Sequence, residues 1–193
     1  MKKLTLLASV AITAVLLFSF INAPSTWSLD KGHAKLGFSI THLSVSEVEG
    51  SFKIFDATIN ATNDDFTDAT VSLSADASSI NTDNEQRDTH LKSADYFDVA
   101  KFPTITFKST SFKKVSEGKY KVIGNLTMHG VTKSVELDAE AKMGVNPMSK
   151  KSIAGFKITG KIKRTDFGIS PSTPSAMLSD EVSIHTNAEF SKN

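Results

Sequence analysis

Apolar and polar residues alternate with a period of two along most of this chain, and that pattern constrains the fold more than any other feature. In segment 152–163 the even positions include Ala154, Phe156, Ile158 and Ile162, whereas lysine or threonine occupies most odd positions. Successive side chains of a β-strand point to opposite faces, so a strand with one buried face produces this alternation. The pattern predicts a sheet with one apolar and one polar face.

Other segments with strand character bring the expected number of strands to about eight. In 50–60 the apolar residues change parity, which predicts a bulge near Ile54. Short connections, such as those near Gly118 and Gly130, favour antiparallel neighbours. We expect an all-β fold, an eight-stranded antiparallel barrel, because closure leaves no unpaired sheet edge. The further predicted strands are 34–42, 50–60, 68–75, 104–112, 119–129, 132–142 and 182–190.

One stretch departs from the β pattern. Thr82 and Glu85 have the spacing of a capping box, with Thr82 as the N-cap. They predict one short helix near residues 83–92, with Leu91 facing inward and Phe97 packed beneath the next loop.

The alternation fits two kinds of barrel. An outer-membrane barrel turns its apolar face to lipid and its polar face to the lumen. Here the polar face is rich in lysine and no aromatic girdles bracket the strands, which favours apolar residues inside. Many of the 13 Phe residues have inward parity, and so do Gly124 and Gly160, where room for a ligand could remain. Periodicity alone leaves open whether the interior is filled or hollow, although eight strands can enclose one small ligand.

The N-terminus has the order of a secretory signal. A basic start at Lys2 and Lys3 precedes an apolar run from Leu4 to Ile21, and Ala23 follows. We expect a signal peptide at 1–23, a mature domain at 24–193 and a periplasmic or secreted protein with no stable membrane span after signal removal. The alternative is a retained anchor, because 18 residues are close to the spanning minimum.

The amino-acid composition argues against several classes of function. The chain has 22 Lys and Arg against 21 Asp and Glu, so loss of Lys2 and Lys3 leaves 20 against 21 and no basic cluster for nucleic acid. It has no Cys, which excludes a thiol nucleophile, a thiolate metal site and a redox pair. None of the 5 His has a known metal-ligand spacing, so no metal site is expected.

Two polar features lie near the expected ends of the barrel. His42 ends an inward-facing series, which indicates either a structural histidine or a partner for a ligand head group. Arg87, Asp88 and His90 either tie the helix to the barrel rim or flank a pocket entrance. No catalytic motif is present, so we expect no enzymatic activity.

Eight segments together resemble the YceI-like family, in the order in which that family carries them. They cover nearly the whole mature chain, and only as a set are they specific. The segments are 27–33, 38–43, 50–56, 79–82, 87–98, 102–107, 124–133 and 164–169.

The resemblance implies a lipocalin-like barrel with a helix at one end, export to the periplasm, and an elongated apolar pocket for an isoprenoid lipid or quinone-like chain. We expect no cofactor besides that ligand and, from the charge balance, no nucleic acid partner, and we also allow for a homodimer. The expected lipid-binding residues are Leu36, Phe38, Ile40, His42, Phe52, Leu73, Leu91, Phe97, Ile105, Phe107, Val122, Leu126, Met128, Phe156, Ile158, Phe167, Met177 and Leu178.

Three functions remain open on this basis. The first is a periplasmic binding or carrier protein for a long-chain isoprenoid or quinone-like amphiphile. The second is a lipid-modifying enzyme that uses His42, Arg87, Asp88 and His90 at the barrel mouth. The third is a stress-related structural protein with a filled core.

Overall fold

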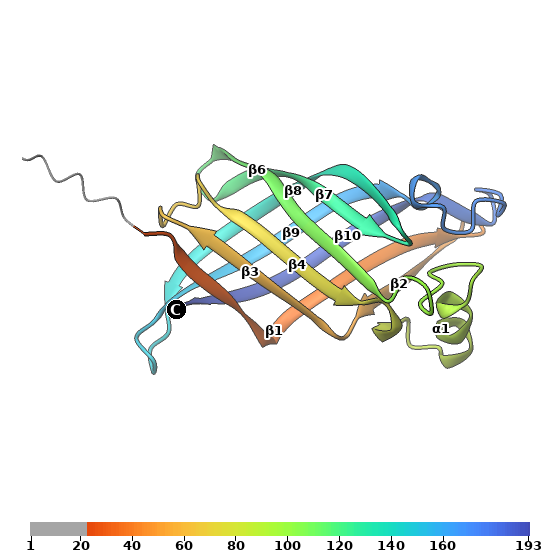
Figure 1. Cartoon of the computed structure of the whole chain (residues 1–193), viewed down its shortest axis with the longest axis horizontal. Helices are drawn as coiled ribbons and strands as arrows, with labels where there is room; N and C mark the ends of the chain where they lie inside the picture. The colour runs from red at the N-terminus through yellow and green to blue at the C-terminus, as the bar shows by residue number, and fades with distance from the viewer. Residues whose placement is uncertain (1–22) are drawn as a thin grey trace, which may run out of the picture.

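The computed structural model describes residues 23–193, so the expected signal lies outside the described residues apart from Ala23. Within 23–193, ten strands form one sheet that closes through pairing of its first and last strands (Figure 1). One α-helix and two short 3₁₀ helices accompany them. The elements are β1 (Ser25–His42), β2 (Ser46–Phe52), β3 (Phe55–Ala61), β4 (Thr70–Asp76), η1 (Ala77–Ser79), β5 (Ile80–Asn81), α1 (Glu85–Lys92), β6 (Thr104–Ser116), β7 (Lys119–Met128), β8 (Val131–Val145), β9 (Ser152–Lys163), η2 (Arg164–Phe167) and β10 (Leu178–Lys192).

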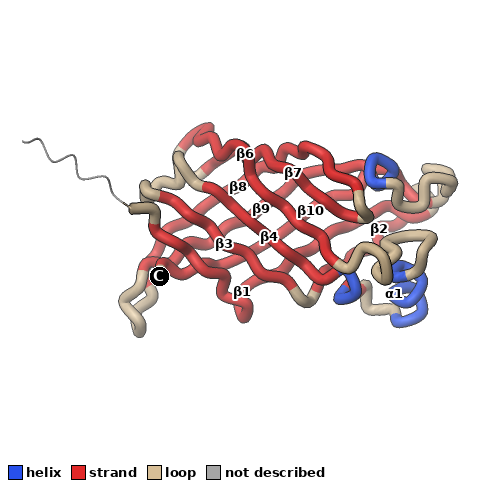
Figure 2. Tube along the Cα trace, in the orientation of Figure 1, coloured by secondary structure: helices blue, strands red, loops and turns tan. Residues whose placement is uncertain are grey.

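The ten strands make eight barrel strands. β2 and β3 follow one another along β1, and β5 and β4 follow one another along β2 and β3. Every pairing is antiparallel. The break between β2 and β3 falls at Lys53 and Ile54, where the change of parity predicts an irregularity. The expected all-β, eight-stranded antiparallel barrel is therefore confirmed. Figure 2 shows that strands form the wall of the barrel, with helices and loops at its ends.

The short helix is confirmed, but its predicted N-cap is wrong. Asn84 caps α1, because its side-chain oxygen accepts a 2.9 Å hydrogen bond from the Arg87 amide. The Thr82 hydroxyl instead donates to Asp88 Oδ1 at 2.5 Å, so it is not available to cap the helix. The predicted capping box does not form, because the amide and the hydroxyl of Thr82 both donate to the buried Asp88 carboxylate.

The two ends of the barrel differ. Figure 1 places α1 and η2 at one end, which we call the helix end, and the β3–β4 loop at the other. We call the second the plug end, because loop 62–69 turns Phe66 inward. The Phe66 side chain is 1% exposed, and its ring centroid lies 5.2 Å from Trp27 and 5.1 Å from Phe156.

A hydrogen bond from the barrel wall fixes the plug. Tyr120 Oη, on β7, donates to the Asp65 carbonyl at 2.8 Å. Burial raises the pKa of Tyr120, so its hydroxyl stays protonated and can donate. Phe66 itself has a left-handed backbone, with φ of 56°, which is unfavourable for a bulky residue. Its packing against Trp27 and Phe156 offsets that strain, so the plug depends on aromatic contacts.

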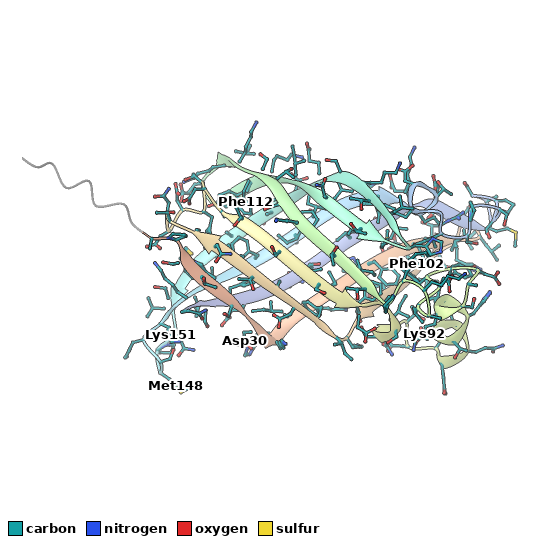
Figure 3. The ribbon with its side chains drawn as sticks, in the orientation of Figure 1. Asp30, Lys92, Phe102, Phe112, Met148 and Lys151 are labelled. Atoms are coloured by element: carbon teal, nitrogen blue, oxygen red, sulfur yellow. The ribbon has the colours of Figure 1, made fainter. Side chains whose placement is uncertain are left out.

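We predict that Phe66→Ala lowers the free energy of unfolding by about 3–5 kcal/mol, because it leaves a cavity among buried aromatic rings. Met148→Ala is the control, since Met148 is 89% exposed on the β8–β9 turn (Figure 3) and its loss should cost less than about 0.5 kcal/mol. Urea unfolding followed by circular dichroism measures both. Equal midpoints for the two variants would show that the plug does not stabilise the barrel.

Candidate functional site

The barrel encloses a cavity of about 450 Å³ that runs from the plug towards the helix end. Side chains from all ten strands line it, together with residues of α1 and of the two loops around it. Its wall is almost entirely aliphatic and aromatic. Its volume lies within the range of roughly 300–1,000 Å³ that is common for small-molecule sites.

The burial pattern along β9 shows that the interior is hollow. Ala154 and Phe156, near the plug, are fully buried. Ile158 and Ile162 have the same inward parity and line the cavity, yet they are only partly buried. Their exposed surface faces the cavity and not the outside of the barrel. This finding contradicts the filled-core alternative.

Two glycines on the inward face contribute in a way that differs from the prediction. A Cβ at Gly124 would collide with the Phe107 ring, and a Cβ at Gly160 would collide with the Leu137 side chain. Neighbouring side chains therefore already occupy the space beside both glycines. They let large neighbours lie flat against the wall, which keeps the centre of the barrel open.

Sixteen of the eighteen expected lipid-binding residues line the cavity, while their contact with a ligand stays a prediction. Phe167 does not line it, because it is 1% exposed inside η2, where its carbonyl accepts a 2.9 Å hydrogen bond from His129 Nδ1. Met177 does not line it either, because the loop before β10 leaves it 54% exposed. The sixteen are Leu36, Phe38, Ile40, His42, Phe52, Leu73, Leu91, Phe97, Ile105, Phe107, Val122, Leu126, Met128, Phe156, Ile158 and Leu178.

A polar network surrounds Thr82 at the helix end. Arg87 donates from Nε to Thr82 Oγ1 and from Nη2 to the Thr82 carbonyl, both at 2.7 Å. Asp88 Oδ1 accepts from the Thr82 amide at 2.9 Å and from its hydroxyl. Thr82, Arg87 and His90 line the cavity, whereas Asp88 is buried behind them and does not. Arg87 thus combines both roles considered for it, because it ties α1 to the rim and borders the cavity.

The cavity opens at the helix end. His42 and His90 line it and are nevertheless exposed to solvent. Arg87 and His90 also border a small outer pocket with Asn84 and Gln86. We call the region around His42, Arg87 and His90 the mouth.

Arg164 is a cavity residue that sequence reasoning missed. It is 3% exposed, and all five of its N–H groups donate to backbone carbonyls. These bonds hold the loop between η2 and β10 over the helix end. Segment 164–169 carries part of the family resemblance, but nothing in it assigned Arg164 a role, because its partners are backbone groups of a loop without regular pattern. The acceptors are Ser179 at 3.1 Å, Ile169 at 3.1 Å, Thr173 at 2.8 Å, Leu178 at 3.1 Å and Ser170.

One cluster of possible metal ligands lies outside the cavity. At the bulge in β1, Asp30, His33 and Glu189 place their ligand atoms within 4.8 Å of one another. The hydrogen bond between His33 Nδ1 and Asp30 raises the pKa of His33 and lowers that of Asp30. His33 thereby already has a partner, and none of the three lines the cavity.

Among residues 23–193, no helix is both long and apolar enough to cross a membrane.

A closed barrel with an apolar interior, one plugged end and one polar mouth has the architecture of eight-stranded barrels that hold a single ligand. The model of the YceI-like domain matches residues 27–190, and the chain belongs to that family. A UPF0312 protein of Staphylococcus aureus strain MSSA476 is 39% identical over 172 residues, which cover 86% of this chain and 98% of that protein.

Solved structures agree on the fold. The Campylobacter jejuni YCEI protein is 34% identical with a TM-score of 0.73, over 79% of this chain and 90% of that one. BcnA of Burkholderia cenocepacia has a TM-score of 0.73 at 22% identity, over 83% and 98% of the two chains. A polyisoprenoid binding domain from Saccharophagus degradans has a TM-score of 0.62 at 17% identity, over 86% and 98%. For BcnA and the Saccharophagus degradans domain, at 22% and 17% identity, the likeness concerns the fold alone.

We predict that Arg164→Gln lowers the free energy of unfolding by about 3 kcal/mol, because several buried carbonyls lose their donor. The neighbouring Lys163→Gln removes the same charge from an exposed position and should change stability by less than about 0.5 kcal/mol. Chemical denaturation measures both variants. Matching stabilities would mean that Arg164 does not hold the loop in place.

Proposed function

We propose that this protein binds and carries one long-chain isoprenoid lipid or quinone-like amphiphile inside the barrel. The observation that carries the proposal is the apolar cavity, which extends from the aromatic plug to the polar mouth. Each buried methylene contributes about 0.8 kcal/mol, so a chain of several prenyl units can bind tightly without strong polar contacts.

The distribution of polarity supports a chain with a head group. Phe156 and Phe190 line the cavity near the plug, where the wall is apolar. Arg87 and His90 line it at the mouth. An amphiphile would place its tail at the plug and its head at the mouth. The Saccharophagus degradans domain, which shares the fold, is named a polyisoprenoid binding domain, and this supports the same ligand class here.

Carriage is better supported than catalysis. A lipid-modifying enzyme would need an acid–base or nucleophilic pair at the mouth. Among the described residues that line the cavity there is no Asp, Glu, Ser or Lys. Arg87 is partly engaged by Thr82, which leaves His42, His90 and Tyr96 as acid–base groups, and no hydrogen bond joins any two of these three side chains in the described chain. The arrangement favours binding.

We propose a periplasmic or secreted location on the strength of the basic and apolar N-terminus. Expression of the full chain in a bacterium with a periplasm should yield a product that lacks about the first 23 residues, in the osmotic-shock fraction. Intact mass spectrometry of that fraction measures it. Full-length protein in the cytoplasm or the membrane pellet would contradict export of a cleaved form.

The cavity can be filled from within to test binding. Ile158→Trp places an indole in the hollow region and should weaken binding of a prenyl lipid by roughly tenfold or more, the equivalent of about two displaced methylenes. Thr159→Trp is the matched control, because it adds the same side chain to the outward face of the same strand. Titration with geranylgeraniol, followed by native mass spectrometry, measures both.

Circular dichroism of the two variants confirms that each retains the barrel before affinities are compared. A folded Ile158→Trp variant with unchanged affinity would show that the lipid does not enter the cavity. Equal weakening in both variants would also contradict the proposal, since Thr159 lies outside the barrel.

A further inference from the structure

The rim of the mouth carries three large apolar side chains that the barrel leaves exposed. Leu43 and Val45, in the turn between β1 and β2, are 51% and 84% exposed, and Met177, in the loop before β10, is 54% exposed. Figure 1 shows that this turn and this loop both lie at the helix end. Single exposed apolar residues are common, but three on neighbouring loops form a patch. We call Leu43, Val45 and Met177 the rim patch.

Hydrogen bonds join the two loops that carry the rim patch. The Leu43 amide donates to the Met177 carbonyl at 2.9 Å. Arg164 holds the loop of Met177 to the end of the barrel, because it donates to the carbonyls of Thr173 and Leu178. The rim patch therefore has a fixed place on the barrel.

The rim patch continues the wall of the cavity. His42 and Leu178 pair at the last step of the register between β1 and β10, and both line the cavity. Leu43 and Met177 are their direct neighbours in sequence, and both are exposed outside it. Apolar surface thus extends from the cavity, past Leu178, onto the rim.

The backbone of the turn shows that the placement of Leu43 has a cost. Leu43 and Ser44 both have a left-handed backbone, with φ of 50° and 57°. That conformation favours Gly, Asn or Asp, and it is unfavourable for a larger side chain. Burial offsets the same strain at Phe66, whereas half of Leu43 is exposed. An apolar partner outside the chain would supply the contacts that Leu43 lacks.

A lipid bilayer fits the position of the rim patch. Among residues 23–193, no Asp or Glu lines the cavity at its mouth, so the phosphate groups of a bilayer surface would meet no carboxylate there. The plug end also exposes apolar side chains, Val145 and Met148. However, Phe66 closes the barrel at that end, so a bilayer there could not exchange lipid with the cavity.

We propose that the rim patch inserts into the surface of a phospholipid bilayer, so that the mouth faces the membrane while the barrel takes up or delivers its lipid. This inference rests on the proposed function, because a bilayer is where a prenyl lipid would be exchanged. Burial of apolar side chains at the bilayer interface favours insertion. Three side chains give reversible binding, which a carrier needs in order to leave the membrane again.

Two double variants with identical changes test the proposal. Val45→Asp/Met177→Asp, the rim variant, places two carboxylates in the rim patch. Val145→Asp/Met148→Asp, the plug-end variant, places them at residues that are 62% and 89% exposed, and Figure 3 shows Met148 on the turn beyond the plug end. Flotation with vesicles of phosphatidylglycerol and phosphatidylethanolamine measures the bound fraction of each protein.

The wild type and the plug-end variant should float with the vesicles, and the rim variant should bind roughly tenfold or more weakly. Binding of the wild type should persist at about 0.5 M NaCl, because salt screens charges but does not weaken apolar insertion.

Two further measurements separate docking from ligand binding. Transfer of a fluorescent prenyl lipid between donor and acceptor vesicles should slow roughly tenfold in the rim variant alone. The affinity for geranylgeraniol, measured without vesicles by native mass spectrometry, should stay within about twofold of the wild type in both variants. Unchanged affinity also shows that the variants are folded.

Equal flotation of the rim variant and the wild type would overturn the inference, and so would an equal loss in the plug-end variant. Wild-type binding that disappears at high salt would also overturn it, since charge and not insertion would hold the protein. A wild type that avoids vesicles and instead forms a dimer, which the rim variant loses, would assign the patch to a second copy.

The same measurements distinguish the two proposals. If the wild type binds geranylgeraniol but does not float, the docking inference fails and the proposed function stands. If the wild type neither binds geranylgeraniol nor transfers prenyl lipid, the proposed function fails together with the inference.

Discussion

The pairing of β1 with β10 is the constraint on which the rest of this structure depends. It joins the first and last strands over a register that runs from Trp27↔Lys192 to His42↔Leu178, and it turns a sheet with one apolar face into a closed barrel. Closure removes the sheet edges and forces all inward side chains to share one interior. Those side chains fill the interior at the plug end and leave it hollow towards the helix end.

Different interactions hold the two ends of the barrel. At the plug end, aromatic rings pack on one another, and Phe66 closes the barrel despite its strained backbone. At the helix end, polar contacts with the backbone replace ring packing, because Arg164 binds loop carbonyls and Arg87 binds Thr82. A closed apolar bottom and a polar opening give the cavity a direction, which matches the orientation proposed for an amphiphile, with its tail at the plug and its head at the mouth.

Much of the barrel follows from local pattern, because the alternation of side chains is a property of each strand. Parity identified β9 with its observed bounds, the irregularity beside Ile54 and most of the cavity wall. The features that the alternation could not predict depend on contacts between residues that are distant in sequence. The roles of Thr82 and Arg164 depend on hydrogen bonds to other segments, and the burial of Phe66 depends on rings of β1 and β9. The sequence could not show that Phe167 and Met177 do not line the cavity, because a four-residue 3₁₀ helix and an irregular loop have no period from which an inward side can be inferred.

The most direct test of the hollow, lipid-binding barrel is native mass spectrometry of the purified protein, followed by organic extraction and analysis of any released lipid. The account predicts one prenyl-chain lipid per barrel, lost on activation and recovered in the extract, or taken up in that ratio when the lipid-free protein is incubated with it. A protein that stays at the bare polypeptide mass after incubation with prenyl lipids would contradict the account.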